Sequence, residues 1–150
     1  MSILKVYLDN CCYNRPYDDQ QQLKIELETK AKLFIQNLAV EKKIHFVWSY
    51  ILDYENSQNS HYQKSSAIEK WQDIAIEDVD ETPKIIEISK LIQQIGIKNA
   101  DSLHIACAIF SGCDYFITVD KRVLKYKDER ISILDPVAFI RIWEELSNDE

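Results

Sequence analysis

The sequence lacks long apolar stretches, although apolar residues make up 46% of its 150 residues. A helix that crosses a bilayer needs about 18 or more consecutive apolar residues, and no run of that length occurs. The amino terminus also lacks the basic segment and following apolar stretch of a secretory signal peptide. These absences predict a cytoplasmic protein that does not span a membrane.

Positive charge is also in short supply. The 18 Lys and Arg residues are outnumbered by 25 Asp and Glu residues, which gives a formal net charge of −7. This balance argues against a protein that holds nucleic acid through bulk electrostatic attraction. It leaves open an enzyme that gathers its acids in one cleft and neutralises them with a metal ion.

The cysteines and histidines show none of the spacings expected of a zinc site. Two of the cysteines are adjacent and therefore do not form a Cys-x-x-Cys pair. In a reducing cytoplasm, thiols within apolar segments are expected to stay free and buried. The four cysteines are Cys11, Cys12, Cys107 and Cys113, and the three histidines are His45, His61 and His104.

Short apolar runs of strand length alternate along the chain with segments of helical periodicity. Strands are expected at residues 3–8, 44–48, 115–119 and 131–134. Residues 74–79 fit either a helix end or a short strand, and the strand is favoured. Helices are expected at about residues 20–40, 50–55, 67–71, 83–95, 99–111, 121–127 and 136–146.

Helix boundaries have clear local signals. Ser49 and Thr82 are good N-cap residues, and Pro83 suits the first position of its helix. The only two glycines of the sequence, Gly96 and Gly112, each stand where a predicted helix ends.

This alternation implies a parallel sheet with helices on both faces. The sequence contains no internal repeat, linker or low-complexity segment. We therefore predict one domain, residues 1–150, with a three-layer α/β/α architecture and a central, mainly parallel, Rossmann-like sheet.

Three predicted strands end on an aspartate, namely Asp9, Asp120 and Asp135. A parallel sheet brings its carboxyl ends to one edge, where α/β proteins bind their ligands. Carboxylates at close range repel one another and burial adds to the cost, so convergent acids imply a cation. Mg²⁺ and Mn²⁺ prefer carboxylate and water oxygens, which makes them the expected ions.

Each acid at an element end also has a structural explanation. Asp135 precedes Pro136, so capping of the last helix accounts for it fully. Asp101 lies in the first turn of its helix, where the helix dipole favours an acid. Asp120 fits the cap of the helix at 121–127.

Three residues of predicted helices, Glu55, Asp53 and His104, also have both a functional and a structural interpretation. Glu55 fits a solvated helix position, and Asp53 competes with it for any role in a site. His104 fits a packing or surface histidine better than a general base, because the sequence shows no partner for it.

Four segments resemble motifs of the PIN-domain family of metal-dependent nucleases, in the family's order. They are Val6–Asn10, Ser49–Glu55, Asn99–Ala106 and Tyr115–Asp120. Together they span nearly the whole chain, and the last two are the more specific. The resemblance places the family's acidic quartet on Asp9, Glu55, Asp101 and Asp120, with Thr118 and Asn10 in supporting positions.

The resemblance implies hydrolysis of RNA phosphodiester bonds with one or two Mg²⁺ or Mn²⁺ ions. In the two-metal scheme, one ion activates the attacking water and the other stabilises the leaving oxygen. Asp9, Asp101 and Asp120 would carry the metals, and Glu55 would bind the second ion or orient the water. Small members that resemble VapC are toxins, so a protein antitoxin and a homodimer are expected as well.

The sequence also departs from the family pattern. The segment after Asp9 is long, and the basic residues nearest the acids are few. Arg15, Lys121 and Arg122 are candidates for RNA contact, with solvated surface as the alternative. The alternative function is a catalytically inactive PIN-fold module that binds RNA or protein. A receiver-like switch fits poorly, because it needs a second acid where Asn10 stands.

Overall fold

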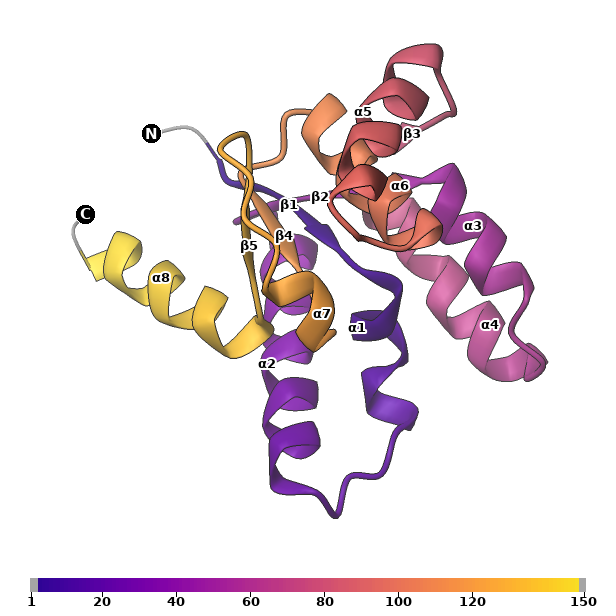
Figure 1. The fold of residues 1–150 in the computed structure, drawn as a ribbon. Coiled ribbons are helices and arrows are strands. Elements are labelled where there is room, and N and C mark those ends of the chain that lie inside the picture. Colours follow the sequence, from indigo (N-terminus) through magenta and orange to yellow (C-terminus); the bar gives the residue numbers. More distant parts are fainter. Residues whose placement is uncertain (1–2, 149–150) are drawn as a thin grey trace.

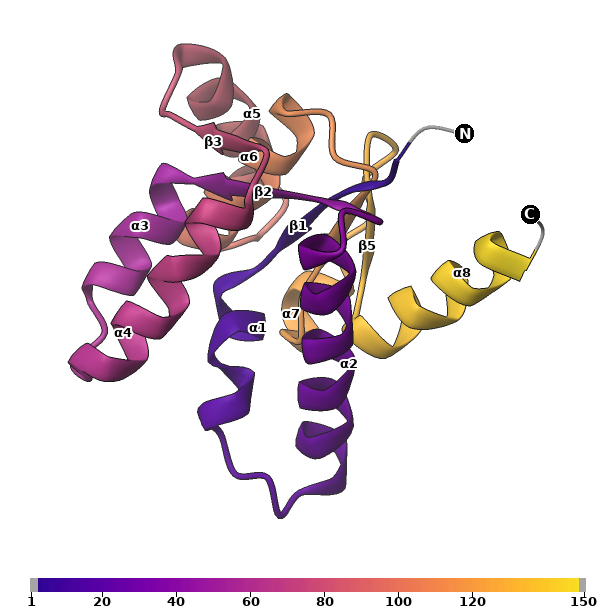
Figure 2. The same ribbon diagram turned by 180° about the vertical axis from the view of Figure 1, so that it is seen from behind.

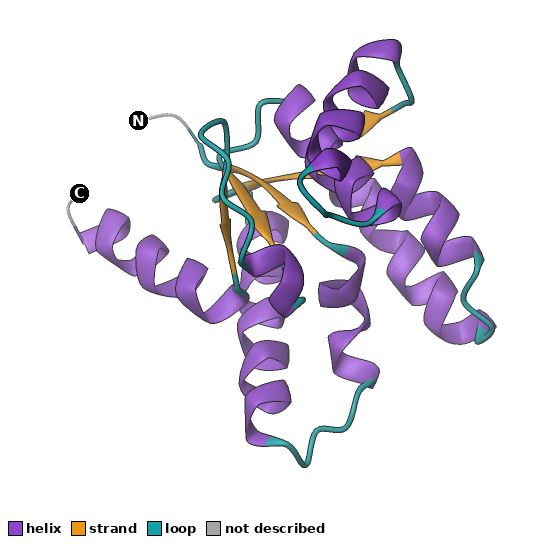
Figure 3. Ribbon diagram, viewed as in Figure 1, coloured by secondary structure: helices purple, strands orange, loops and turns teal. Residues whose placement is uncertain are grey.

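A computed structural model describes residues 3–148 of the chain. Five strands form one sheet in the order β3-β2-β1-β4-β5, and all neighbouring pairs are parallel (Figures 1 and 3). The prediction of a mainly parallel α/β sheet is therefore confirmed. The strands are β1 (Lys5–Leu8), β2 (His45–Ser49), β3 (Glu77–Val79), β4 (Tyr115–Ile117) and β5 (Ser132–Leu134).

Helices cover both faces of the sheet, which gives the predicted three layers. α2 and α8 pack against each other, and α5 packs against α6 on the opposite face (Figures 1 and 2). The long helices are α2 (Leu23–Val40), α5 (Pro83–Gln94), α6 (Asn99–Phe110) and α8 (Pro136–Asn148). The shorter elements are α1 (Asn10–Asn14), η1 (Arg15–Tyr17), α3 (Tyr50–Ser57), α4 (Tyr62–Glu69), η2 (Lys70–Ile74) and α7 (Lys121–Leu124). None of the helices within residues 3–148 is long and apolar enough to cross a membrane.

The central strand β1 is buried on both sides, as its near-continuous apolar sequence predicts. Val6, Tyr7 and Leu8 are each 0% exposed. β1 lies between β2 and β4, so the order of the strands reverses at this point. In open α/β sheets, ligands bind beyond the carboxyl ends of the strands at such a reversal. A ligand site is therefore expected beside the residues that follow β1 and β4.

The helix boundaries show the predicted local chemistry. The Ser49 hydroxyl accepts a hydrogen bond from the Leu52 amide at 3.2 Å, and the Thr82 hydroxyl accepts one from Ile85 at the same distance. Gly96 and Gly112 have φ angles of 106° and 74°, a region that costs other residues more. These boundaries are set by short-range interactions, which is why the sequence predicts them well.

Several boundaries differ from the predictions: the helix expected at 20–40 begins at Leu23, the strand expected at 115–119 ends at Ile117, and α1 has no counterpart among the predicted helices. Two further differences go with side-chain contacts. The helix expected at 67–71 spans Tyr62–Glu69, and Ser65 within it bonds to Asn56 of the preceding helix. The helix expected at 121–127 ends at Leu124. Here the Tyr126 hydroxyl donates to Asp128 at 2.6 Å and holds the chain in a turn. Both differences go with side-chain hydrogen bonds that the helical periodicity of the sequence does not reveal.

Candidate metal centre

A cleft of about 340 Å³ opens at the carboxyl edge of the sheet. All four acids of the predicted quartet line it, although they come from four separate parts of the chain. The lining residues are Asp9, Asn10, Cys11, Asn14, Asp18, Glu55, Asp101 and Asp120.

Asp9 follows β1 and is held by two elements at once. It is 4% exposed, and its Oδ1 accepts a hydrogen bond from the Asn10 amide at 2.8 Å. Its Oδ2 accepts a hydrogen bond from the Thr118 hydroxyl at 2.8 Å, and the Asp9 amide donates to the Ile117 carbonyl at 2.9 Å. Because Leu8 pairs with Ile117 in the sheet, Asp9 and Thr118 emerge side by side. Asp9 thus caps α1 and faces the cleft.

Thr118 connects the two strand-end acids. Its side chain is fully buried, donates to Asp9, and accepts a hydrogen bond from the Asp120 amide at 3.1 Å. Asp120 also accepts through Oδ1 from the Arg122 amide at 2.8 Å, so it caps α7 as well as lining the cleft. The capping and cleft interpretations of Asp9 and Asp120 are therefore compatible.

Glu55 and Asp53, which the sequence leaves as alternatives, point to different places. Glu55 lines the cleft, and its Oε1 is hydrogen-bonded to Nε2 of His104. Asp53 accepts a hydrogen bond from the Trp48 indole at 2.8 Å and lines a separate hollow with Asn56. Asp135, the third acid at a strand end, accepts from the Ala138 amide at 2.9 Å and lies outside the cleft, as its capping interpretation predicts.

Besides Cys11, Asn14 and Asp18 of the cleft lining, the residue that the sequence interpretation missed is His104. It is 0% exposed, its Nδ1 lies 2.6 Å from the Tyr7 hydroxyl, and its Nε2 lies 3.9 Å from Oδ1 of Asp9. One signal in the sequence does point to it. His104 stands three residues after Asp101 on a helix, and Tyr7 stands two residues before Asp9 on a strand, so each pair shares a side of its element.

The site carries a surplus of negative charge. Burial, followed by the charges of Asp9 and Asp120, raises the pKa of Asp101 to about 6. Burial lowers the pKa of His104, but the hydrogen bond to Glu55 and the charge of Asp9 outweigh it, so the net shift is upward. Both shifts reflect a cluster of carboxylates that favours a proton or a cation.

The donor set fits a divalent metal ion. Ligand atoms of Asp9, Glu55 and His104 all lie within 4.8 Å of one another. Asp101 and Asp120 bring two more carboxylates to the same cleft. Carboxylate oxygens around a site with room for water suit Mg²⁺ or Mn²⁺.

The three basic residues predicted to contact RNA adjoin lining residues of the cleft but do not line it themselves. Arg15 donates to Glu28 at 2.8 and 3.0 Å and to Asp18 at 3.0 Å, so its charge is already paired. Lys121 and Arg122 are exposed at the start of α7, next to Asp120. Within residues 3–148, no Lys or Arg side chain lines the cleft.

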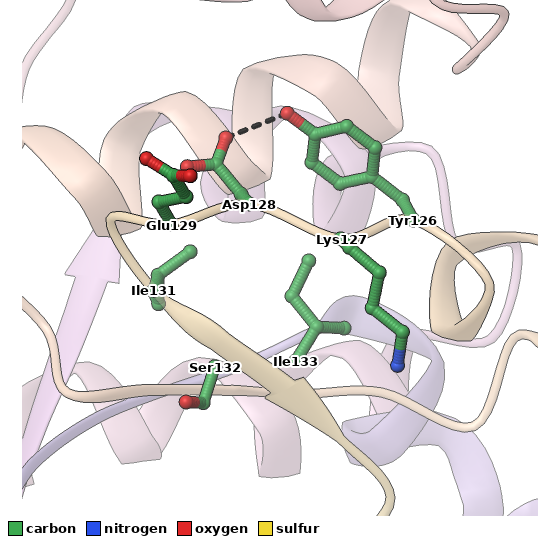
Figure 4. A pocket seen from close by; sticks show the side chains of 7 residues that line it. All are labelled: Tyr126, Lys127, Asp128, Glu129, Ile131, Ser132 and Ile133. Carbon is green, nitrogen blue, oxygen red and sulfur yellow. Dashed lines mark hydrogen bonds between the residues drawn. The ribbon is translucent and has the colours of Figure 1, made fainter.

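A larger hollow, of about 490 Å³, lies beside β5 and is lined by residues 126–129 and 131–133 (Figure 4). Two acids line it, Asp128 and Glu129. Asp128 is bonded to the Tyr126 hydroxyl and to Arg130, and these hydrogen bonds, with that of Arg130 the strongest, lower its pKa to about 2. Lys127 points away from Asp128. The larger volume of this hollow therefore does not make it the candidate metal centre.

Comparison with known proteins supports the fold. No protein-family model and no curated protein sequence matches the chain. A chain in the crystal structure of VapBC2 from Rickettsia felis, bound to a DNA fragment from their promoter, has the same fold with a TM-score of 0.52. The match covers 87% of the present chain and 97% of that chain, at 19% sequence identity. The fold is PIN-like and resembles that of VapBC2. The predicted resemblance is thus confirmed at the level of the fold.

Proposed function

We propose that this protein is a divalent-metal-dependent ribonuclease and the toxin of a toxin–antitoxin pair. The observation that supports this most directly is the convergence of Asp9, Glu55, Asp101 and Asp120 on one cleft at the strand-order reversal. Four carboxylates in one cleft repel each other unless a cation is present. A bound divalent cation offsets this repulsion, so the cleft favours the metal ion that the reaction requires.

In this proposal, Asp9, Asp101 and Asp120 hold the metal, and Glu55 binds a second ion or orients the attacking water. Bound Mg²⁺ or Mn²⁺ would supply Lewis acidity and neutralise charge on the phosphodiester. Thr118 keeps Asp9 and the Asp120 backbone in register through its hydrogen bonds to both. Asn10 holds Asp9 from the other side through its backbone amide.

The same charges make substrate binding depend on the metal. RNA is a polyanion, and the cleft offers it acids without a lining Lys or Arg among the described residues. An RNA phosphate would therefore approach productively only when a cation is bound. This predicts that a chelator abolishes cleavage and also weakens RNA binding at the cleft.

The proposed partners follow from the structural neighbour. That crystal structure contains a VapBC2 assembly. By analogy we propose that a small protein antitoxin binds the present chain and that the chain forms a homodimer. Co-purification with the product of an adjacent small gene, and the mass of the purified protein in solution, test these two points.

The central experiment measures cleavage of a fluorescent RNA by purified protein in Mg²⁺ or Mn²⁺. Asp9→Asn and Asp101→Asn should abolish cleavage while leaving the protein folded. Asp135→Asn is a matched control, because it changes a strand-end acid outside the cleft and Asn still caps a helix. Equal cleavage by wild type, Asp9→Asn and Asp101→Asn would contradict the proposal. RNA binding without metal binding or cleavage would instead favour a non-catalytic module.

A further inference from the structure

We propose that a buried hydrogen-bond relay through Ser49, Tyr7 and His104 positions Glu55 in the cleft. In this relay His104 is a positioning residue, which donates from Nε2 to Glu55 and does not bind the metal. The inference rests on the proposed function of the cleft, and it adds a role for three residues outside the acidic quartet.

The relay is continuous and closed to solvent. The Tyr7 hydroxyl lies 2.6 Å from the Ser49 hydroxyl and 2.6 Å from Nδ1 of His104. Nε2 of His104 is hydrogen-bonded to Glu55. Ser49, Tyr7 and His104 are each 0% exposed. A buried polar group without a partner is costly, so moving any member of a fully paired network is unfavourable. The relay therefore restricts the positions of its members.

The relay connects Glu55 on α3 to residues of β1, β2 and α6. Tyr7 comes from the central strand β1, Ser49 from the end of β2, and His104 from α6. The Tyr7 ring stacks on Phe116 of β4 at 5.4 Å and 12°. The rigid centre of the sheet is thereby connected to an acid on α3, a short helix.

The hydrogen-bond partners determine where the protons lie. An ionised carboxylate only accepts, so the His104–Glu55 bond requires a hydrogen on Nε2. In a neutral imidazole Nδ1 then accepts from the Tyr7 hydroxyl, and in a protonated imidazole both nitrogens carry hydrogen and Nε2 still donates to Glu55. The Ser49 hydroxyl donates to the Tyr7 oxygen and itself accepts from the Leu52 amide at 3.2 Å. Every group in this arrangement is satisfied.

The hydrogen on Nε2, which both protonation states share, separates two roles for His104. A nitrogen that carries hydrogen has no free lone pair for a metal ion, although Nε2 lies near Asp9 and Glu55. The imidazole therefore orients the Glu55 carboxylate through this hydrogen bond. Glu55 needs this help, because its long side chain is 29% exposed while the His104 side chain is fully buried. Partners that orient a metal ligand are typically worth about 10–100-fold in metal affinity or activity.

The test compares wild type with Tyr7→Phe, His104→Gln and His104→Leu. Tyr7→Phe removes one hydroxyl and leaves the stacked ring, so we expect Mn²⁺ affinity by calorimetry to fall about tenfold. His104→Leu should lose more, and His104→Gln should recover part of the loss, because its amide still donates to Glu55. Tyr50→Phe is the matched control, since the Tyr50 hydroxyl is buried without a hydrogen-bond partner. It should leave Mn²⁺ affinity unchanged.

A spectroscopic measurement separates positioning from ligation. Electron spin echo modulation of bound Mn²⁺ should show no histidine ¹⁴N coupling in wild type. Histidine coupling that disappears in His104→Gln would overturn the relay, as would equal Mn²⁺ affinity in wild type, Tyr7→Phe and His104→Gln. If Tyr7→Phe does not fold, His104→Gln alone decides the affinity arm. Relay-dependent Mn²⁺ binding without any RNA cleavage would support the relay and overturn the ribonuclease proposal.

Discussion

The two walls of the cleft hold their acids in different ways. On the strand wall, Asp9 directly follows β1 and Asp120 lies three residues after the end of β4, and the backbone and Thr118 fix them. On the helix wall, Glu55 and Asp101 extend from α3 and α6, and Glu55 depends on His104. A carboxylate at a strand end inherits the rigidity of the sheet, whereas one on a helix needs side-chain partners to be placed. The strand wall should therefore tolerate the least change.

The largest effect is expected from Asp9→Asn on the strand wall. This change removes one charge from the proposed metal site but keeps an oxygen that caps α1. Cleavage should fall by more than about 100-fold, the upper range for groups that merely support a ligand. Single-turnover cleavage of RNA in Mn²⁺ measures this. A loss as small as that of Tyr7→Phe would show that the two walls are equivalent.

Thr118→Val should have the next largest effect. It removes the hydroxyl that bonds Asp9 and leaves the partly buried Asp120 amide without its acceptor. We expect a stability loss of about 1–3 kcal/mol and a roughly tenfold loss of cleavage. Urea denaturation and cleavage rates measure the two effects. Thr29→Val is the control: Thr29 is also a buried donor, to the Arg15 carbonyl, so its loss should lower stability without lowering cleavage.

Asp101 on the helix wall should make metal binding depend on pH near 6. Its pKa is raised to about 6, foremost by burial, so a proton competes with the metal as pH falls through this value. Mn²⁺ affinity by calorimetry should drop between pH 7 and pH 5. Without metal, the folded state binds this proton more tightly than the unfolded chain, so the group's contribution to stability is lost as pH rises through about 4 to 6.

Asp101→Asn should remove that dependence on pH. In metal-free protein at pH 8 it should also raise stability, by about 1 kcal/mol after solvent screening is allowed for. Thermal melts with and without EDTA measure this. A lower melting temperature for Asp101→Asn in EDTA would contradict the proposed repulsion among the acids.

The smallest effect is expected from the exposed cations beside the strand wall. Lys121→Gln combined with Arg122→Gln should raise KM for RNA a few-fold and flatten its salt dependence, because phosphate contacts release counterions. The value of kcat should not change. KM measured at several salt concentrations tests this. An unchanged KM would assign both residues to solvated surface.

Local chemistry makes much of this protein predictable. Asp9 and Asp120 terminate apolar strands, and Ser49, Thr82 and the two glycines mark helix ends within a few residues of sequence. Such signals depend on neighbouring residues alone. The parallel sheet then brings the strand-end acids to one edge without further information. The layered α/β fold and the strand wall therefore follow from the amino-acid sequence by itself.

Only the tertiary structure decided how the helix wall is built. The choice between Glu55 and Asp53 depends on the rotation of α3, which places Glu55 against His104 and Asp53 against Trp48. The ion pair of Arg15 with Glu28 likewise joins residues on separate elements. His104 has partners 97 and 49 residues away, in Tyr7 and Glu55. Sequence periodicity shows which face of a helix a residue occupies, but only the packing of distant elements shows what that face meets.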